Sequence, residues 1–309
     1  MKNLLSIFFL TFFIFSCSKE DKLNKNAVPG IKVLNESSVS TSKIESWTSY
    51  ASKKMKDQNA DILAVCWDVG SYVKEGGFDK PFNTHEVIIS QNQIETLITG
   101  ISEWLDKSCL GNNDKKAELK NYREYLEKGA DASTQLDVCP KFRILLMAFT
   151  KEMKEEAKQG LVLHELYHAF QHDLPDNDCR KLREKSDTNA KWIVEGGAEY
   201  FNKVVSGEMN NEDGVSNLLK MAYDDYQSSK DPSITGDGIA TRGAAGIRLM
   251  IERGLITESV ILDGSFFHSC SSENEWSNDN SNVAKIKNRW YLIEEKNGKY
   301  VFTAAALGG

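Results

Sequence analysis

The stretch LHELYHAFQH, residues 163–172, holds three of the five histidines in this chain of 309 residues. Its composition predicts a helix, on which His164 and His168 lie one turn apart on the same face. Both imidazoles can then reach one metal ion, and Glu165 lies beside them, where it can hold a water on that ion. The alternative is a surface helix whose histidines bind nothing.

His172 continues the histidine stripe by one more turn. A straight helix places it ~6 Å beyond His168 and ~12 Å from His164. One zinc ion with bonds of ~2 Å cannot reach all three side chains. We therefore expect His172 not to be a ligand.

A second stretch, WIVEGGAEYF at residues 192–201, lies on a separate helix predicted over 189–205. A catalytic zinc site has three protein ligands and an open position for water, and Glu195 supplies the third ligand. Glu199, one turn later, can accept the outer ring N–H of a ligand histidine. Gly196 and Gly197 leave room for two helices to approach closely. The two stretches together predict a Zn²⁺ site.

HExxH followed by a glutamate on a downstream helix resembles the glutamate-zincin metallopeptidases, and residues 164–201 are most similar to the catalytic cores of bacterial collagenases and aminopeptidase N. The resemblance implies a hydrolase with a zincin-like domain. In it, His164, His168 and Glu195 hold zinc, Glu165 is the general base, and Glu199 supports a ligand. The implied substrate is a protein or peptide.

The aminopeptidase-like members place a tyrosine, which stabilises the oxyanion, three residues before a Gly-Ala pair on a later helix. Here Gly243-Ala244 is preceded at that position by Ala240, so the tyrosine is absent. The candidate replacements are polar or cationic side chains that are equally suited to surface or packing roles: Arg242, Tyr223, Tyr226 and His268.

Residues 120–160 lack the Gly-rich acidic stretch with which aminopeptidases bind a substrate amine, which favours an endopeptidase. The alternative from another class is a zinc-binding surface lipoprotein that is weakly active or inactive and serves as a binding module. A hydrolase of non-peptide amides is a third interpretation.

The N-terminus has one lysine, an apolar run from Leu4 to Phe15, and then Ser16-Cys17. This pattern is typical of a secretory signal and resembles the lipobox of bacterial lipoproteins. It implies a signal peptide at 1–16 and lipid on Cys17 (palmitate among its acyl chains). Residues 17–40 are then a tether, and the expected location is a bacterial outer membrane or cell surface, with the periplasmic face of the membrane as the alternative. The membrane is thus an expected partner.

Net charge is −7, which gives no electrostatic footprint for nucleic acid. Cys66 lies in an apolar run and is expected to be a buried free thiol. Disulfides between Cys109 and Cys139 and between Cys179 and Cys270 are one pairing among several, because connectivity does not follow from sequence. Oligomeric state is not indicated.

Periodicity and turn residues predict a predominantly helical α+β fold with strands near the N-terminus and a C-terminal hairpin. Residues 41–309 form the expected catalytic domain, with a subdomain boundary near 140–160 left open. The expected helices cover 40–56, 91–105, 114–128, 140–172 with a break at Gly160, 189–205, 213–228 and 239–252. The expected strands are Ile62–Trp67, Val87–Ile89, and the hairpin pair 289–293 and 299–303 around Asn297-Gly298.

Overall fold

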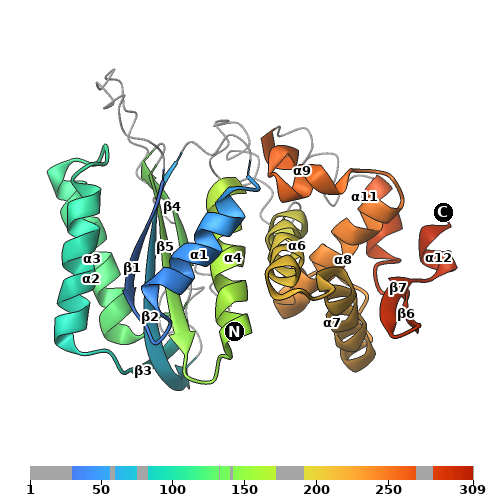
Figure 1. Ribbon diagram of the computed structural model, residues 1–309, viewed down its shortest axis with the longest axis horizontal. Coiled ribbons are helices and arrows are strands. Elements are labelled where there is room, and N and C mark those ends of the chain that lie inside the picture. The colour runs from blue at the N-terminus through green and yellow to red at the C-terminus, as the bar shows by residue number, and fades with distance from the viewer. Residues whose placement is uncertain are drawn as a thin grey trace, which may run out of the picture.

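The computed structural model describes residues 30–55, 60–74, 83–131, 133–139, 142–171, 191–268 and 281–308. The fold is α+β and mostly helical, as predicted, with a sheet in its N-terminal half and a helical C-terminal half (Figure 1). The sheet has the order β1-β2-β5-β4, with β3 also paired to β2. Its strands are β1 (Ile31–Glu36), β2 (Asp61–Lys74), β3 (Thr84–Val87), β4 (Ser133–Cys139) and β5 (Phe142–Thr150). The strands β1, β2 and β5 are parallel, whereas β3 and β4 are antiparallel to their neighbours.

Helices cover both faces of the sheet (Figure 1). The helices α2 (Gln91–Leu105) and α3 (Asn112–Lys128) lie on one face, and α1 (Thr41–Ser52) and α4 (Glu155–Gln171) lie on the other. Successive side chains of a strand point to opposite faces. On β2, Leu63, Val65 and Trp67 therefore enter the core beside α2, while Ile62, Ala64 and Cys66 enter the core beside α4.

The C-terminal half is built around α6 (Lys191–Asn210), which packs against α4 on one side and α8 (Ile239–Glu252) on the other. One hydrophobic core extends from the sheet through α4 and α6 to α8. The remaining elements complete this half: α7 (Gly214–Ser229), η1 (Gly236–Gly238), α9 (Glu258–Leu262), η2 (Ser265–His268), α11 (Ser281–Lys287), β6 (Ile293–Lys296), β7 (Lys299–Phe302) and α12 (Ala304–Leu307).

The contact between α6 and α8 depends on glycine at position 196. A Cβ on Gly196 would lie 2.5 Å from the carbonyl carbon of Gly243 and 2.8 Å from the nitrogen of Ala244. Both are backbone atoms of α8, so the helices would have to separate. The prediction that glycines here permit a close helix approach is confirmed, with α8 as the neighbour at Gly196.

Replacing Gly196 with Ala should lower stability by about 1–3 kcal/mol, the usual cost of overpacking. The sign of the change in stability is informative, because Gly→Ala in a helix interior ordinarily stabilises a protein by roughly 0.5–1 kcal/mol. Urea denaturation measures the change. The comparison is Gly111→Ala at the N-cap of α3, where a Cβ would meet only the Asp114 carboxylate at 3.4 Å, so its cost reflects the N-cap preference for glycine over alanine and not overpacking. Equal or higher stability of the Gly196 variant would contradict the close packing.

Two helix predictions are wrong. Residues 142–150 form strand β5 rather than part of a helix over 140–172. A continuous apolar run suits a strand buried on both faces as well as a buried helix. The second error is the break at Gly160, since α4 is continuous from Glu155 to Gln171. Gly160 instead lets α6 approach, because its Cβ would lie 3.1 Å from Asn202 Oδ1.

The prediction of a tether over 17–40 is wrong for residues 31–36, which form strand β1 in register with β2. The domain therefore begins ahead of residue 41, while residues 1–29 lie outside the described part of the chain. The C-terminal hairpin is confirmed, and Asn297 and Gly298 both have positive φ at its turn. Its first strand begins at Ile293, later than the predicted 289.

Cys66 is a buried free thiol, as predicted, and burial raises its pKa. Cys109 is disulfide-bonded. The side chain of Cys139, together with Cys17, Cys179 and Cys270, lies outside the described residues, so both suggested pairings stay predictions. Among the described helices, none has the length and apolar character needed to cross a membrane.

Candidate metal centre

The centre is formed by α4 and α6, which lie side by side in opposite directions. Near the start of α4, Gln159 accepts a hydrogen bond from Asn210 at the end of α6. At the end of α4, Gln171 contacts Val194 near the start of α6. His164 and His168 lie between these two ties, on the stripe of α4 that faces Glu195 and Glu199.

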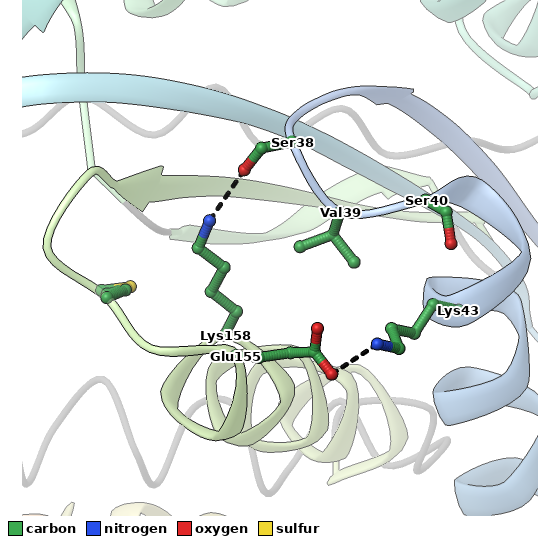
Figure 2. A pocket seen from close by; sticks show the side chains of 7 residues that line it. Ser38, Val39, Ser40, Lys43, Glu155 and Lys158 are labelled. Carbon is green, nitrogen blue, oxygen red and sulfur yellow. Dashed lines mark hydrogen bonds and ion pairs between the residues drawn. The ribbon is translucent and has the colours of Figure 1, made fainter.

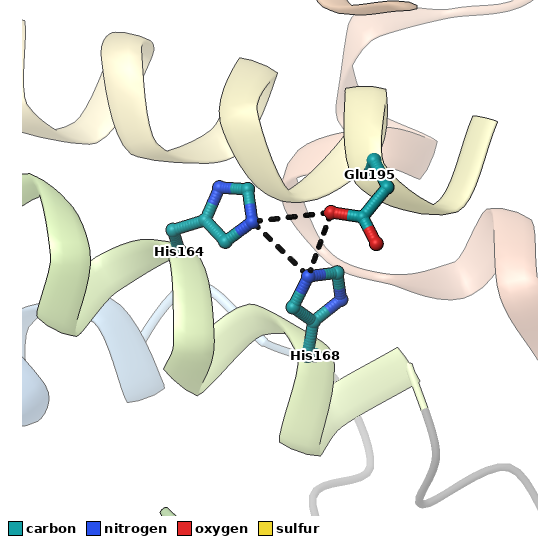
Figure 3. Close-up of side chains that lie close together, drawn as sticks. All are labelled: His164, His168 and Glu195. Atoms are coloured by element: carbon teal, nitrogen blue, oxygen red, sulfur yellow. Dashed lines mark hydrogen bonds and ion pairs between the residues drawn. The ribbon is translucent and has the colours of Figure 1, made fainter. Parts of the chain in front are cut away.

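Three ligand atoms converge here, as Figure 3 shows. The Nε2 atoms of His164 and His168 are 3.1 Å apart, and Glu195 Oε2 lies 3.5 Å from the first and 3.4 Å from the second. A tetrahedral ion with bonds of ~2.0–2.1 Å separates its ligand atoms by ~3.3 Å. The three atoms therefore fit one face of a tetrahedral metal site, which leaves the fourth position for water or substrate.

The hydrogen-bond partners of the two histidines also favour a bound cation. His164 Nδ1 faces Glu199 Oε2 at 3.3 Å, and His168 Nδ1 faces Gln171 Oε1 at 2.7 Å. A neutral imidazole with its hydrogen on Nδ1 has a bare lone pair on Nε2. Two lone pairs and a carboxylate oxygen then face one another, an arrangement that a cation stabilises.

The titration behaviour of the same groups reflects this concentration of acceptors. Burial opposes charge on His164, but its hydrogen bonds with Glu195 and Glu199 outweigh burial and raise its pKa to about 10. Burial likewise raises the pKa of Glu195, yet the hydrogen bonds from His164 and His168 dominate and lower it overall. The acceptors that raise the pKa of His164 are also those that would favour a bound metal cation, and metal binding requires the imidazole to be neutral.

Glu199 supports His164 from behind, as the sequence predicts. Glu199 is buried. It also accepts a hydrogen bond from Asn202 at 3.0 Å and forms an ion pair with Lys203 at 3.2 Å. Despite burial, the pKa of Glu199 is lowered to about 2 by the hydrogen bond with His164 and the charge of Lys203. The carboxylate is thus ionised and fixed in place.

Sequence reasoning missed Gln171, the corresponding support for His168. The available signal was its position: it lies three residues after His168, hence on a neighbouring part of the same helical face.

Glu165 is half-buried and follows His164 directly on α4. Its negative charge contributes to raising the pKa of His164. The role of Glu165 as a base beside the metal stays a prediction.

Arg242 is not available as an oxyanion donor. It is buried, and it donates to Asp225, Asp231, Ser229 and the carbonyl of Ser233. These contacts occupy the Nε–H and both terminal nitrogens, so Arg242 holds the end of α7 to α8 and the candidate role is wrong.

The two tyrosine candidates pack against the C-terminal segment. Tyr223 contacts the ring of Tyr300 at a centroid distance of 5.5 Å, and Tyr226 stacks on Tyr291 at 4.4 Å. The structure does not bring them to the metal ligands. The side chain of His268 and the whole of His172 lie outside the described residues, so those two predictions stay as they were.

A cavity of about 280 Å³ lies on the other side of α4, between this helix and the segment that leads into α1. Figure 2 shows Lys158 bonded to Ser38, and Lys43 paired with Glu155, across this space. None of the three candidate metal ligands lines it. The cavity is separate from the metal centre.

No protein family, curated protein or solved structure matches this chain. The function must therefore be argued from the side chains that α4 and α6 bring together.

Proposed function

We propose that this protein is a zinc-dependent endopeptidase with a zincin-like catalytic domain. His164, His168 and Glu195 hold the metal, and Glu165 is the general base. The observation that carries the proposal is the triangle of ligand atoms with edges of 3.1, 3.4 and 3.5 Å, with both histidine Nδ1 atoms turned outward to other partners.

When bound in such a site, zinc lowers the pKa of a coordinated water and polarises a substrate carbonyl. Glu165 takes the proton of the attacking water and passes it to the leaving amine. Glu199 keeps His164 oriented through its Nδ1 hydrogen, and Lys203 and Asn202 keep Glu199 in place. The side chain of His164 therefore keeps its orientation while the substrate reacts.

An assay of the full chain with an unstructured protein as substrate tests this function. We expect one zinc per chain and internal fragments, with cleavage lost on chelation and restored by one equivalent of zinc. Stepwise release of N-terminal residues would instead indicate an aminopeptidase.

The second candidate function is a zinc-binding surface lipoprotein with weak or no activity. It is favoured by the engagement of Arg242 and by the packing of Tyr223 and Tyr226, which leave three of the four oxyanion candidates without that role. Stoichiometric zinc without cleavage across varied substrates would support this candidate over the endopeptidase.

Zinc should stabilise the folded chain, because ligands from two helices meet only in the native state. At a free zinc concentration 1,000 times the dissociation constant, the gain is about 4 kcal/mol. For a chain of this size, Tm then rises by roughly 10 °C. Thermal melts with and without a chelator measure the shift. A Tm that is unchanged by zinc and by chelator would contradict the proposed metal site.

Membrane attachment through lipid on Cys17 is part of the proposal, and it is based on the sequence of residues 1–17. Cys17→Ala should move the protein from the membrane fraction to the soluble fraction of the expressing bacterium. Fractionation with immunoblotting, and labelling with a palmitate analogue, check this. A variant that stays in the membrane fraction would contradict the lipid anchor.

A further inference from the structure

We propose that Gln171 is a positioning residue of the metal centre that fixes one ligand on each of the two helices. Its side chain orients His168 directly and holds the α6 backbone beside Glu195. The inference rests on the proposed metal site and adds a residue that the two sequence motifs do not include.

The hydrogen bonds of Gln171 determine the orientation of its amide. Gln171 Nε2 donates to the carbonyl oxygen of Val194 at 2.9 Å. Only the nitrogen of an amide can donate, so Oε1 is the atom that faces His168 Nδ1 at 2.7 Å. The hydrogen of His168 must then be on Nδ1, which leaves Nε2 bare for the metal. One contact with α6 thus sets the tautomer of a ligand on α4.

Gln171 also fixes the backbone next to Glu195. Val194 directly precedes Glu195, so the hydrogen bond from Gln171 to the Val194 carbonyl fixes the backbone of α6 next to the third proposed ligand. Gln171 is only 1% exposed. Gly197 makes room for the amide, because a Cβ at that position would lie 3.2 Å from Gln171 Nε2 and 3.0 Å from Phe267.

The two histidines therefore have unlike supports. His164 is backed by an ionised carboxylate that is itself paired with Lys203. His168 is backed by a neutral amide that donates onward to the other helix. Loss of an outer support of this kind costs 10–100-fold in metal affinity, and loss of Gln171 removes the α6 tie as well.

Gln159 provides a matched control on the same helix. It is 4% exposed, and it also ties α4 to α6, by accepting from Asn210 at 3.0 Å. It contacts no metal ligand. A methionine at either position removes a buried amide of similar size, so the pair separates packing and stability from metal positioning.

The experiment measures zinc dissociation constants by competition with a chromophoric chelator, together with the Tm of the zinc-free protein. We expect Gln171→Met to weaken zinc binding 10–100-fold and Gln159→Met to change it less than threefold, with similar Tm losses. Gln171→Glu keeps an acceptor for His168 but cannot donate to Val194, so its affinity should lie between Gln171→Met and wild type.

Cobalt-substituted protein gives a second readout, because visible absorption of Co²⁺ reports ligand geometry. The spectrum should change in Gln171→Met and stay unchanged in Gln159→Met. Zinc affinity in Gln171→Met within twofold of wild type, or equal losses in both methionine variants, would overturn the positioning role. If wild type itself binds no zinc, the proposed metal site has failed instead, so the two failures are distinguishable.

Discussion

Glu165→Gln should abolish peptide cleavage while leaving zinc bound at one ion per chain. The amide is nearly the same size as the carboxylate but cannot take a proton from water. General acid–base groups contribute roughly 10²–10⁴-fold to rate, so turnover should fall by at least that factor. Initial rates with a fluorogenic unstructured substrate, and zinc content by elemental analysis, measure the two quantities.

A surface carboxylate on α4 provides the control for this variant. Glu155, in the first turn of α4, pairs with Lys43, and Glu155→Gln should leave the rate within about twofold, since its effect is limited to a surface ion pair. Full activity in Glu165→Gln would contradict the assignment of the base. Loss of zinc together with activity would show that Glu165 acts on metal binding rather than on proton transfer.

Glu195→Ala should produce the largest loss of zinc affinity among the substitutions considered, at least 10³-fold. The variant keeps only two ligands, whereas a catalytic zinc site needs three from the protein. The pKa of His164 should also fall from about 10, because its hydrogen bond with Glu195 is the largest contribution that raises it. Zinc competition measures the first effect, and NMR titration of the imidazole in the metal-free protein measures the second.

Glu199→Gln is the graded comparison for Glu195→Ala. It leaves all three ligands in place and alters the partner of His164 Nδ1, so its loss should stay within 10–100-fold. Unchanged zinc affinity in Glu195→Ala would exclude Glu195 as a ligand. Similar losses in the two variants would mean that the carboxylates act as general negative charge rather than in distinct roles.

The candidate ligands were accessible to sequence reasoning because helical periodicity is a local rule. The four-residue spacing of His164 and His168 places them on one face wherever that helix lies. Glu195 required only that a second helix pass nearby, and the glycines after it indicated a close approach. The structure brings one potential ligand atom from each of these three residues together, as the local pattern predicts.

The errors occurred where tertiary contacts decide the outcome. The run from Ile144 to Phe149 is apolar throughout because helices cover both faces of β5, which removes the alternation that marks a strand. Strand β1 is short and its sequence is mixed in polarity, so its pairing with β2 shows only in the fold. Gln171 and Arg242 likewise depend on partners that are distant in sequence: Val194 for the first and Asp225 for the second.

Under the proposed function, the opposed packing of α4 and α6 makes the metal a removable cross-link. His168 and Glu195 are 27 positions apart in the chain, and an ion bound to both closes the loop between them much as a disulfide would. Closing a loop of this length lowers the entropy of the unfolded chain by roughly 3–4 kcal/mol in free-energy terms. Amide hydrogens in the first turns of α6 should therefore exchange faster once the ion is removed, while those of β2 and β5, in the centre of the sheet, keep their protection.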